Sequence, residues 1–357
     1  MQRNTGYQQA LFPSLITQFP STRYQGSKAK LVPWIWEQIA DLSFTTCLDA
    51  FGGTGAVAYR LKQEGKQVTY NDLLRFNHTI GLALIENDQV GLSSKDVDWL
   101  LQRHAEIEYP RFVQDNFSDI YFTDEENAWI DQTITNIRRL DDPYRFALAF
   151  FALCQACIIK RPYNLFHRKN LYIRLAEVDR SFGNKTTWDT PFDEWFRIFV
   201  QEANRAVFEN GQRNRALNVD AADVPGEFDL VYVDPPYISK RGVAVDYLDF
   251  YHFLEGLTLY DEWGISLDRT SKHRRLKPRS SEWTDKHRIR AAFERVFKRH
   301  QNSIIIVSYR SDGIPSEPEL LSLLQQYKRN VRVEHFGQYK YVLSTNSESE
   351  EFLLIGV

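Results

Sequence analysis

Residues 46–72 read TCLDAFGGTGAVAYRLKQEGKQVTYND, an apolar strand, a glycine-rich turn, a helix and a second strand in succession. The turn spans Gly52 to Gly55, and its glycines let the backbone approach a ligand closely. Asp72 ends the second strand, where a carboxylate suits ribose hydroxyls. The stretch predicts a βαβ unit, and therefore an α/β protein built on a Rossmann-like sheet.

The glycine turn leaves two cofactor classes open. Residues 53–58 fit the dinucleotide pattern GxGxxA, which keeps a nicotinamide-dependent or flavin-dependent oxidoreductase in consideration. Asp49 stands beside the turn, however, where a carboxylate repels a pyrophosphate and attracts a cationic amino acid group. S-adenosylmethionine carries a sulfonium and an ammonium and has no phosphate. The acid beside the turn therefore favours S-adenosylmethionine.

A second signal lies downstream, where residues 228–237 read FDLVYVDPPY, a buried-strand pattern that runs into a proline-rich loop. The two prolines remove two N–H donors and stiffen the backbone, so the loop offers mainly hydrogen-bond acceptors. Asp234 and the carbonyl of Pro235 could each accept one proton of an amino group such as that of adenine, while Tyr237 stacks on the base. The structural alternative is a turn that only ends the strand.

These stretches follow one another in a fixed order along most of the chain: Arg23-Tyr24-Gln25-Gly26-Ser27-Lys28, then Asp49 to Gly55, Asp72, Asp220, and Asp234-Pro235-Pro236-Tyr237. In this order the chain resembles the Dam-type, α-group DNA adenine N6-methyltransferases. The resemblance implies a Rossmann-like, S-adenosylmethionine-dependent methyltransferase sheet with a mostly helical target-recognition insertion. It also implies that Asp234, Pro235, Pro236 and Tyr237 are the catalytic residues.

The resemblance further implies a set of cofactor contacts, namely Tyr24, Lys28, Asp49, Phe51, Gly53, Gly55, Asp72 and Asp220. Tyr24 and Lys28 would contact the methionine end of the cofactor, and Asp220 the adenine amine. Ala221 stands where the family often has a bulkier residue, which leaves stacking on the cofactor adenine open.

The alternation of strands and helices stops between residues 87 and 212. Helices are expected over 97–108, 123–140, 143–159 and 192–210, with a β-rich stretch at 159–188. Thr123 and Glu126 form a capping-box pattern at the start of the second helix. We therefore expect residues 1–86 and 213–357 to form the catalytic domain and residues 87–212 the target-recognition, DNA-binding domain.

Two segments favour contact with nucleic acid. Residues 160–172, KRPYNLFHRKNLY, interleave cations, amides and aromatic rings on an expected hairpin, which suits base readout and stacking. By resemblance this is the Tyr-Asn hairpin of the target-recognition region, with contacts from Tyr163, Asn164 and Arg168. The alternative is that the aromatic rings pack within the hairpin. Residues 180–185 continue it as a further polar-aromatic loop.

The second segment is cationic. The whole chain has a net charge of −3, yet residues 269–299 hold twelve Lys and Arg against three acids. Such segregation gives a nearly neutral protein a cationic face for phosphates. We expect Arg274 and Arg275, in a loop, to contact DNA.

Other features bound the class of protein. No apolar run is long enough to cross a membrane, residues 1–20 lack the apolar region of a signal peptide, and three cysteines suit a reducing cytoplasm. Cys154 and Cys157 lie in an apolar helical stretch and are expected to pack in the core. The histidines show no ligand spacing, so no metal is expected. Residues 339–344 and 352–357 suit an antiparallel hairpin.

The sequence thus predicts a site-specific enzyme that transfers a methyl group from S-adenosylmethionine to N6 of a flipped adenine in double-stranded DNA. A restriction endonuclease is a candidate partner, and no association with a membrane is expected. Cytosine N4, RNA adenine and protein-glutamine methyltransferases stay open, as do a nicotinamide-dependent oxidoreductase and a catalytically idle DNA-binding protein. Neither the recognition sequence nor the oligomeric state follows from the sequence.

Overall fold

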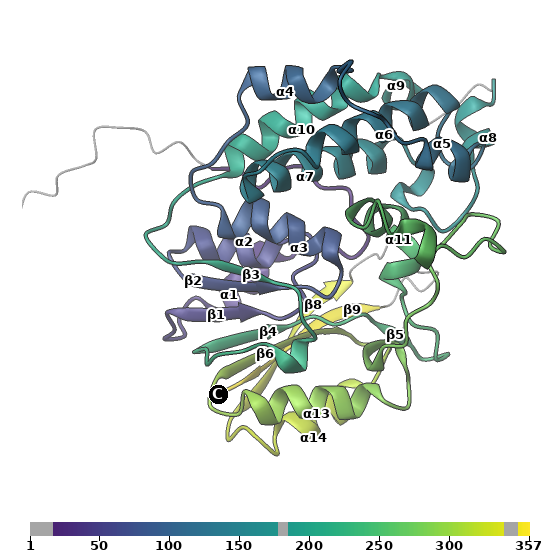
Figure 1. Cartoon of the computed structure of the whole chain (residues 1–357). Coiled ribbons are helices and arrows are strands. Elements are labelled where there is room, and N and C mark those ends of the chain that lie inside the picture. The colour runs from purple at the N-terminus through teal and green to yellow at the C-terminus, as the bar shows by residue number, and fades with distance from the viewer. Residues whose placement is uncertain (1–16, 178–184, 339–348) are drawn as a thin grey trace, which may run out of the picture.

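The computed structural model describes residues 17–177, 185–338 and 349–357. A seven-stranded sheet with the strand order β3-β2-β1-β4-β6-β9-β8 forms its centre (Figure 1). The first five strands in this order are parallel, and β9 runs antiparallel to both of its neighbours. The strands are β1 (Thr46–Asp49), β2 (Gln67–Asn71), β3 (Arg215–Leu217), β4 (Leu230–Val233), β6 (Ile304–Arg310), β8 (Val331–Gln338) and β9 (Glu350–Gly356). The expected α/β class is confirmed.

Helices and short turns connect these strands. A small second sheet pairs β5 (Ile238–Ser239) with β7 (Gly313–Ile314). The α-helices are α1 (Val32–Ile39), α2 (Ala56–Gln63), α3 (Arg75–Gly81), α4 (Ser94–Leu101), α5 (Phe112–Phe117), α6 (Asp124–Ile137), α7 (Pro143–Ile159), α8 (Leu171–Leu175), α9 (Lys185–Asp189), α10 (Phe192–Ala206), α11 (Tyr247–Thr258), α12 (Trp263–Ser266), α13 (Ile289–Arg299) and α14 (Glu317–Leu324). A π-helical turn, η1 (Leu82–Glu86), extends α3, and 3₁₀ turns are η2 (Pro162–Asn164), η3 (Ala221–Asp223) and η4 (Glu282–Thr284).

The central strands β1, β4 and β6 are buried on both faces because they are apolar on both sides. Successive residues alternate between two cores, so Cys47, Tyr232 and Ile306 join one cluster while Leu48 and Val231 join the other. The helices α13 and α14 cover one face, and α1, α2 and α3 cover the other (Figure 1). Near-continuous apolar strands covered on two sides are typical of parallel sheets.

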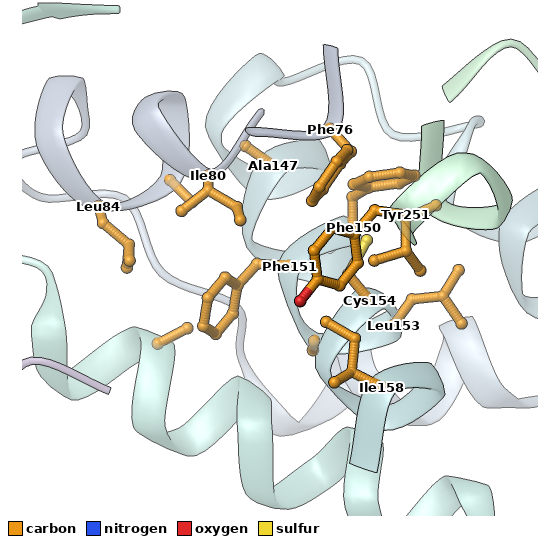
Figure 2. Packing of buried hydrophobic residues seen from close by; sticks show 14 of the residues in the cluster. Phe76, Ile80, Leu84, Ala147, Phe150, Phe151, Leu153, Cys154, Ile158 and Tyr251 are labelled. Atoms are coloured by element: carbon orange, nitrogen blue, oxygen red, sulfur yellow. The ribbon is translucent and has the colours of Figure 1, made fainter. Parts of the chain in front are cut away.

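Helices α4 to α10 form the insertion predicted between β2 and β3, and they lie above α2 and α3 in Figure 1. The predicted helix 143–159 is confirmed as α7, and Thr123 with Glu126 forms the predicted capping box of α6. Figure 2 shows α7 packed on Phe76 and Ile80 of α3, with Cys154 inside the cluster. The core is therefore continuous from the sheet into the insertion.

The predicted β-rich stretch at 159–188 is wrong for the residues that the structure describes. These residues form η2, α8 and α9 and contain no strand. Tyr163 and Asn164 have φ angles of 63° and 58°, which an extended strand excludes. Arg161 is buried and donates to the carbonyls of Leu165 and Tyr121, so it holds a compact loop in place of a hairpin. The predicted loop at 180–184 lies outside the described residues.

The second strand of the predicted C-terminal hairpin, residues 352–357, corresponds to most of β9. The strand that pairs with β9 is β8, and the predicted strand at 339–344 lies outside the described residues. No helix within the described part of the chain is long and apolar enough to cross a membrane.

Candidate active site

A cavity of about 180 Å³ opens beside the ends of β1, β2 and β4, the place where parallel α/β sheets bind ligands. Six separate parts of the chain supply its walls. Those that the sequence predicted are Tyr24, Lys28, Asp49, Phe51, Gly53, Asp72, Asp234 and Pro236. The fold therefore brings together residues that are more than 200 positions apart in the chain.

The glycine turn forms the floor of this cavity. The amide of Gly52 donates to the carbonyl of Asn71 at 2.8 Å, and that of Gly53 donates to the Asp72 carboxylate at 2.9 Å. Gly53 has a φ of +52°, and a Cβ there would stand 4.0 Å from the ring of Tyr24. A side chain would thus enter the space in front of Tyr24. Asp72 both anchors the turn and faces the cavity.

Asp49 is the carboxyl group in the cavity wall whose ionised form is disfavoured most. Its side chain is buried, and Oδ1 has no hydrogen-bond partner among the described residues. Burial raises the pKa of Asp49 to about 8, with further contributions from the nearby Asp234 and Asp72. Among the described residues, the ionisable side chains that line the cavity are four acids and two bases: Asp49, Asp72, Asp234, Asp246, Lys28 and Arg279. This balance favours a cationic ligand over an anionic one.

Tyr24 forms an aromatic wall with α11. Its ring stacks on Tyr251 at 4.4 Å between centroids and lies nearly parallel to Tyr247 at 5.7 Å. Asn77 donates to the Tyr24 hydroxyl at 3.2 Å and to Asp72 at 3.1 Å. Sequence reasoning identified Tyr24 but missed Tyr247, because only the packing of α11 brings it to the cavity.

Asp234 is held by a buried polar cluster. Lys28 Nζ lies 3.0 Å from Asp234 Oδ1 and 2.7 Å from Glu351 Oε1, and it also donates to the Tyr237 hydroxyl. Burial raises the pKa of Asp234 to about 6, although Lys28 opposes the shift. Burial lowers the pKa of Lys28, but Asp234 and Glu351 outweigh it and raise the value. Asp234 is therefore ionised near neutral pH, and Lys28 is its partner within the protein.

Four predicted residues do not line the cavity directly: Gly55, Asp220, Pro235 and Tyr237. Gly55, with a φ of +79°, caps α2 from behind the turn. Asp220 accepts from the amide of Ala222 at 2.9 Å and caps η3. The Tyr237 hydroxyl points into the cluster below Asp234, and its ring packs edge-on against Tyr309 at 4.9 Å.

Sequence reasoning also missed several cavity residues. They come from the start of α11 and from the segment before α13: Asp246, Tyr247, Leu248, Arg279, Ser280, Ser281, Trp283 and Thr284. Asp246 caps α11 by accepting from the amide of Asp249, a pattern that could have been recognised in the sequence. The others carry no local signal, since they reach the cavity only through the fold.

The loop of residues 161–170, within the predicted nucleic-acid segment 160–172, packs against α11. The amide of Phe166 donates to the carbonyl of Phe250 at 2.9 Å, and His252 lies 3.1 Å from the carbonyl of Phe166. Tyr163 is 68% exposed at the tip of this loop. Because the first residues of α11 line the cavity, the loop and the cavity are joined by one helix.

The predicted cationic segment 269–299 does not form a single face. Its first part is a loop, as expected, and the hydroxyl of Tyr121 in the insertion donates to the carbonyl of His273 at 2.8 Å. Arg275 lies 3.4 Å from Asp268, and Arg274 donates to the carbonyl of Arg269, so both predicted contacts also hold the loop itself. The second part is α13, which covers the opposite face of the sheet (Figure 1).

Comparison with known proteins agrees with this geometry. The sequence profile of the family described as D12 class N6 adenine-specific DNA methyltransferase matches residues 24–303. The chain is 30% identical over 345 residues to the Type II methyltransferase M2.HphI of Haemophilus parahaemolyticus, which covers 94% of this chain and 97% of that protein.

Two further relatives differ in length. The Type II methyltransferase M.CviAII of Paramecium bursaria Chlorella virus 1 is 25% identical over 349 residues, with 92% of this chain and 96% of that protein covered. The Type II methyltransferase M.FokI of Planomicrobium okeanokoites is 25% identical over 350 residues, with 92% of this chain covered. The chain spans about half of M.FokI, because the alignment covers 51% of that protein.

Proposed function

The chain belongs to the D12 class of N6 adenine-specific DNA methyltransferases, and from this membership we propose that the cavity binds S-adenosylmethionine and presents its methyl group to an adenine held by Asp234. The observation that carries the proposal is the shared cavity. The glycine turn, the unpaired Asp49 oxygen and Asp234 all border the same space. A donor and an acceptor site so close together suit direct transfer between two bound molecules.

S-adenosylmethionine fits the residues present. Its ammonium and sulfonium match an acidic lining, and the Asp49 Oδ1 atom lacks a partner that such a cation would provide. The open space above Gly53, which a Cβ would occupy, leaves room for the cofactor beside Tyr24. Asp72 would accept from ribose hydroxyls through the lone pairs that Gly53 and Asn77 leave free. The same carboxylates would repel the negative charges of a pyrophosphate.

When bound, the cofactor would supply a methyl carbon attached to a positively charged sulfur. The methyl carbon would pass to the amine in one step, and the sulfur would leave as a neutral thioether. Asp234 and the Pro235 carbonyl would each accept a proton of the adenine amine and so aim its lone pair. Asp234 would also receive the proton that the amine loses as it gains the methyl group. The aromatic wall of Tyr24 and Tyr247 would exclude water from this side of the cavity.

DNA contact is proposed for the loop of residues 161–170 and for the loop of residues 267–280, since both contact α11 beside the cavity. Tyr163, Asn164 and Arg168 would contact bases or backbone, and the cations of the second loop would contact phosphates. Rotation of the target adenine out of the duplex costs roughly a few kcal/mol, which these contacts would offset. Residues 87–212 would then be the target-recognition domain.

A cognate restriction endonuclease is also proposed as a partner, because the relatives are named as Type II methyltransferases and modification methylases. A chromosomal DNA substrate would place the protein in the cytoplasm. DNA from a host that expresses the chain should resist an endonuclease extracted from the source strain, and cleavage at the methylated sites would contradict the partnership.

The direct test of the proposed function is methylome sequencing of a host that expresses the chain. We expect N6-methyladenine at one short sequence and in no control host that carries an Asp234→Ala variant. N4-methylcytosine would assign the alternative base, and methylated RNA with unmodified DNA would assign the alternative substrate. Either result would contradict the proposal.

A further inference from the structure

Glu351 is a buried carboxylate below the cavity that the sequence patterns did not single out. It lies on β9, the antiparallel strand, and its side chain is fully buried. Oε1 accepts from Ser308 at 2.6 Å and from Lys28 at 2.7 Å, and it lies 2.8 Å from the Tyr237 hydroxyl. A buried charge is costly unless it is paired, so its position calls for a reason beyond packing.

Two contacts of Glu351, Lys28 and Tyr237, are also contacts of Asp234. Lys28 pairs with both carboxylates, at 2.7 Å to Glu351 and 3.0 Å to Asp234. The Tyr237 hydroxyl lies 2.8 Å from Glu351 and 2.9 Å from Asp234. A hydroxyl has one proton, so Tyr237 can donate to only one of the two acids at a time. Glu351 therefore competes with Asp234 for two donors.

The geometry at Asp234 is one-sided. Both protein donors, Lys28 and Tyr237, reach Oδ1, and among the described residues none donates to Oδ2. Asp234 itself lines the cavity and keeps 14% of its side chain exposed. Oδ2 is thus the oxygen left for a ligand, and Oδ1 fixes the orientation of the carboxylate.

We propose that Glu351 is a positioning residue for methyl transfer. It shares the donors Lys28 and Tyr237 with Asp234, so the Asp234 carboxylate stays oriented and remains a strong hydrogen-bond acceptor. This inference rests on the proposed function. Without the charge of Glu351, Lys28 and Tyr237 would both turn fully to Asp234. Asp234 would then be a weaker acceptor for the substrate amine and easier to ionise.

The direction of the pH effect follows from the surrounding groups. Glu351 raises the pKa of Asp234, and its loss should lower that pKa. The groups that face this pair are Lys28 before α1, Asp49 on β1, Tyr232 on β4, Tyr237 after it, Ser308 and Tyr309 on β6, and Tyr247 on α11. Burial raises the pKa of the tyrosines Tyr232, Tyr247 and Tyr309 above their ordinary value, so they stay neutral near pH 6.

The test is Glu351→Gln, which keeps the shape and removes the charge. The turnover number is measured from pH 5 to 8 with cofactor and DNA saturating, so that titration of Asp49 and Asp72 in the cofactor site does not enter. In the wild type the rate should fall as the pH drops through about 6, where Asp234 takes up a proton. In the variant the maximal rate should fall by up to roughly 10²-fold, and the acidic limb should move to lower pH.

Glu350→Gln is the matched control. Glu350 precedes Glu351 on the same strand, so its side chain points to the other face, where it lies 3.6 Å from His335. It should keep the wild-type rate and pH profile. If Glu351→Gln showed a wild-type rate, or a reduced rate with an unmoved acidic limb, the proposed role would be overturned.

A second variant covers the event that Glu351→Gln does not fold. Glu351→Asp keeps the charge but withdraws the oxygen by one methylene, so the rate should fall while the acidic limb stays in place. A wild-type rate in this variant would also overturn the role. The wild-type protein in the same assay separates the two proposals: if it fails to methylate adenine N6, the proposed function fails, whatever the variants do.

Discussion

The single side chain of Asp49 lowers the free energy of unfolding near neutral pH and at the same time favours the binding of a cation. Its pKa is raised to about 8 in the folded protein, against 3.8 for an ordinary aspartate. Between these values the folded protein holds a proton that the unfolded chain releases. The free energy of unfolding therefore falls as the pH rises from about 4 to about 8, in the absence of ligand. A bound cation would reverse this by favouring the ionised form.

The first prediction is that cofactor affinity depends on the charge of Asp49. Binding should release a proton, so the affinity for S-adenosylmethionine should rise by up to about tenfold per pH unit between pH 6 and 7.5. Asp49→Asn should weaken binding and abolish the pH dependence, while it raises the thermal midpoint of the ligand-free protein at pH 8. Titration calorimetry in buffers of different ionisation enthalpy and thermal melts measure these effects.

Asp41→Asn is the control for this prediction, since Asp41 is exposed at the end of α1. It should leave affinity and melting unchanged. Binding by Asp49→Asn that matches the wild type at every pH would remove Asp49 from the cofactor site.

The predictable side chains of the site share one property, which is a local signal. Asp234 is followed by two prolines, and Gly53 lies in a glycine-rich turn, so each constrains its own neighbours in the sequence. Glu351 and Tyr247 act through residues far away in the chain. Their neighbours in the sequence therefore give no sign of the cavity, and only the packing of β9 and α11 shows it.

The loop of residues 161–170 shows why one element was mispredicted. Its tyrosine and phenylalanine residues favour strands on average, in agreement with the hairpin that the family resemblance implied. Burial of the Arg161 guanidinium among the carbonyls of Tyr121, Leu165 and Arg168 overrides that preference. Such a contact joins the loop to another part of the insertion, so no local pattern predicts it. By contrast, the caps of α6 and α7 are local, and both helices were predicted correctly at their starts.

The second prediction separates strain from recognition in this loop. Asn164 has a φ of +58°, a conformation that costs most residues roughly 1–2 kcal/mol but suits glycine. Asn164→Gly should therefore keep or raise the free energy of unfolding, whereas Asn164→Ala should lower it by about 1 kcal/mol. Both variants delete the amide, so both should discriminate less among DNA sequences. Chemical denaturation and methylome sequencing provide the two measurements.

The outcome that contradicts this prediction is specific. If Asn164→Gly kept full discrimination, the side chain would not read DNA, and the left-handed turn would serve only the shape of the loop.

The cations of residues 269–299 lie on two different sides of the molecule. The loop of residues 267–280 lies beside α11 and the insertion, and α13 lies on the opposite face with α14 (Figure 1). A sequence shows that cations cluster along the chain but not which face each one reaches. The cluster at 269–299 was therefore found from composition, and its division between two faces was not.

The third prediction follows from that division. DNA affinity should fall linearly with the logarithm of salt concentration, and Lys272→Ala should reduce the slope by about 0.9, the value for one lost phosphate contact. Lys298→Ala, an exposed lysine on α13, removes the same charge from the other face and should leave the slope unchanged. Fluorescence anisotropy with a labelled duplex between roughly 50 and 200 mM salt measures the slope. Equal effects of the two variants would contradict the assigned DNA-binding face.

The central claim is that Asp234 grips the substrate amine in the cavity that holds the methyl donor. The most direct measurement compares Asp234→Ala with the wild type in single-turnover methyl transfer and in cofactor binding. We predict a loss of transfer of about 10²-fold or more, with cofactor affinity changed by less than about threefold, because the acceptor acts on the reacting amine and not on the cofactor. Transfer at the wild-type rate in Asp234→Ala would contradict the claim.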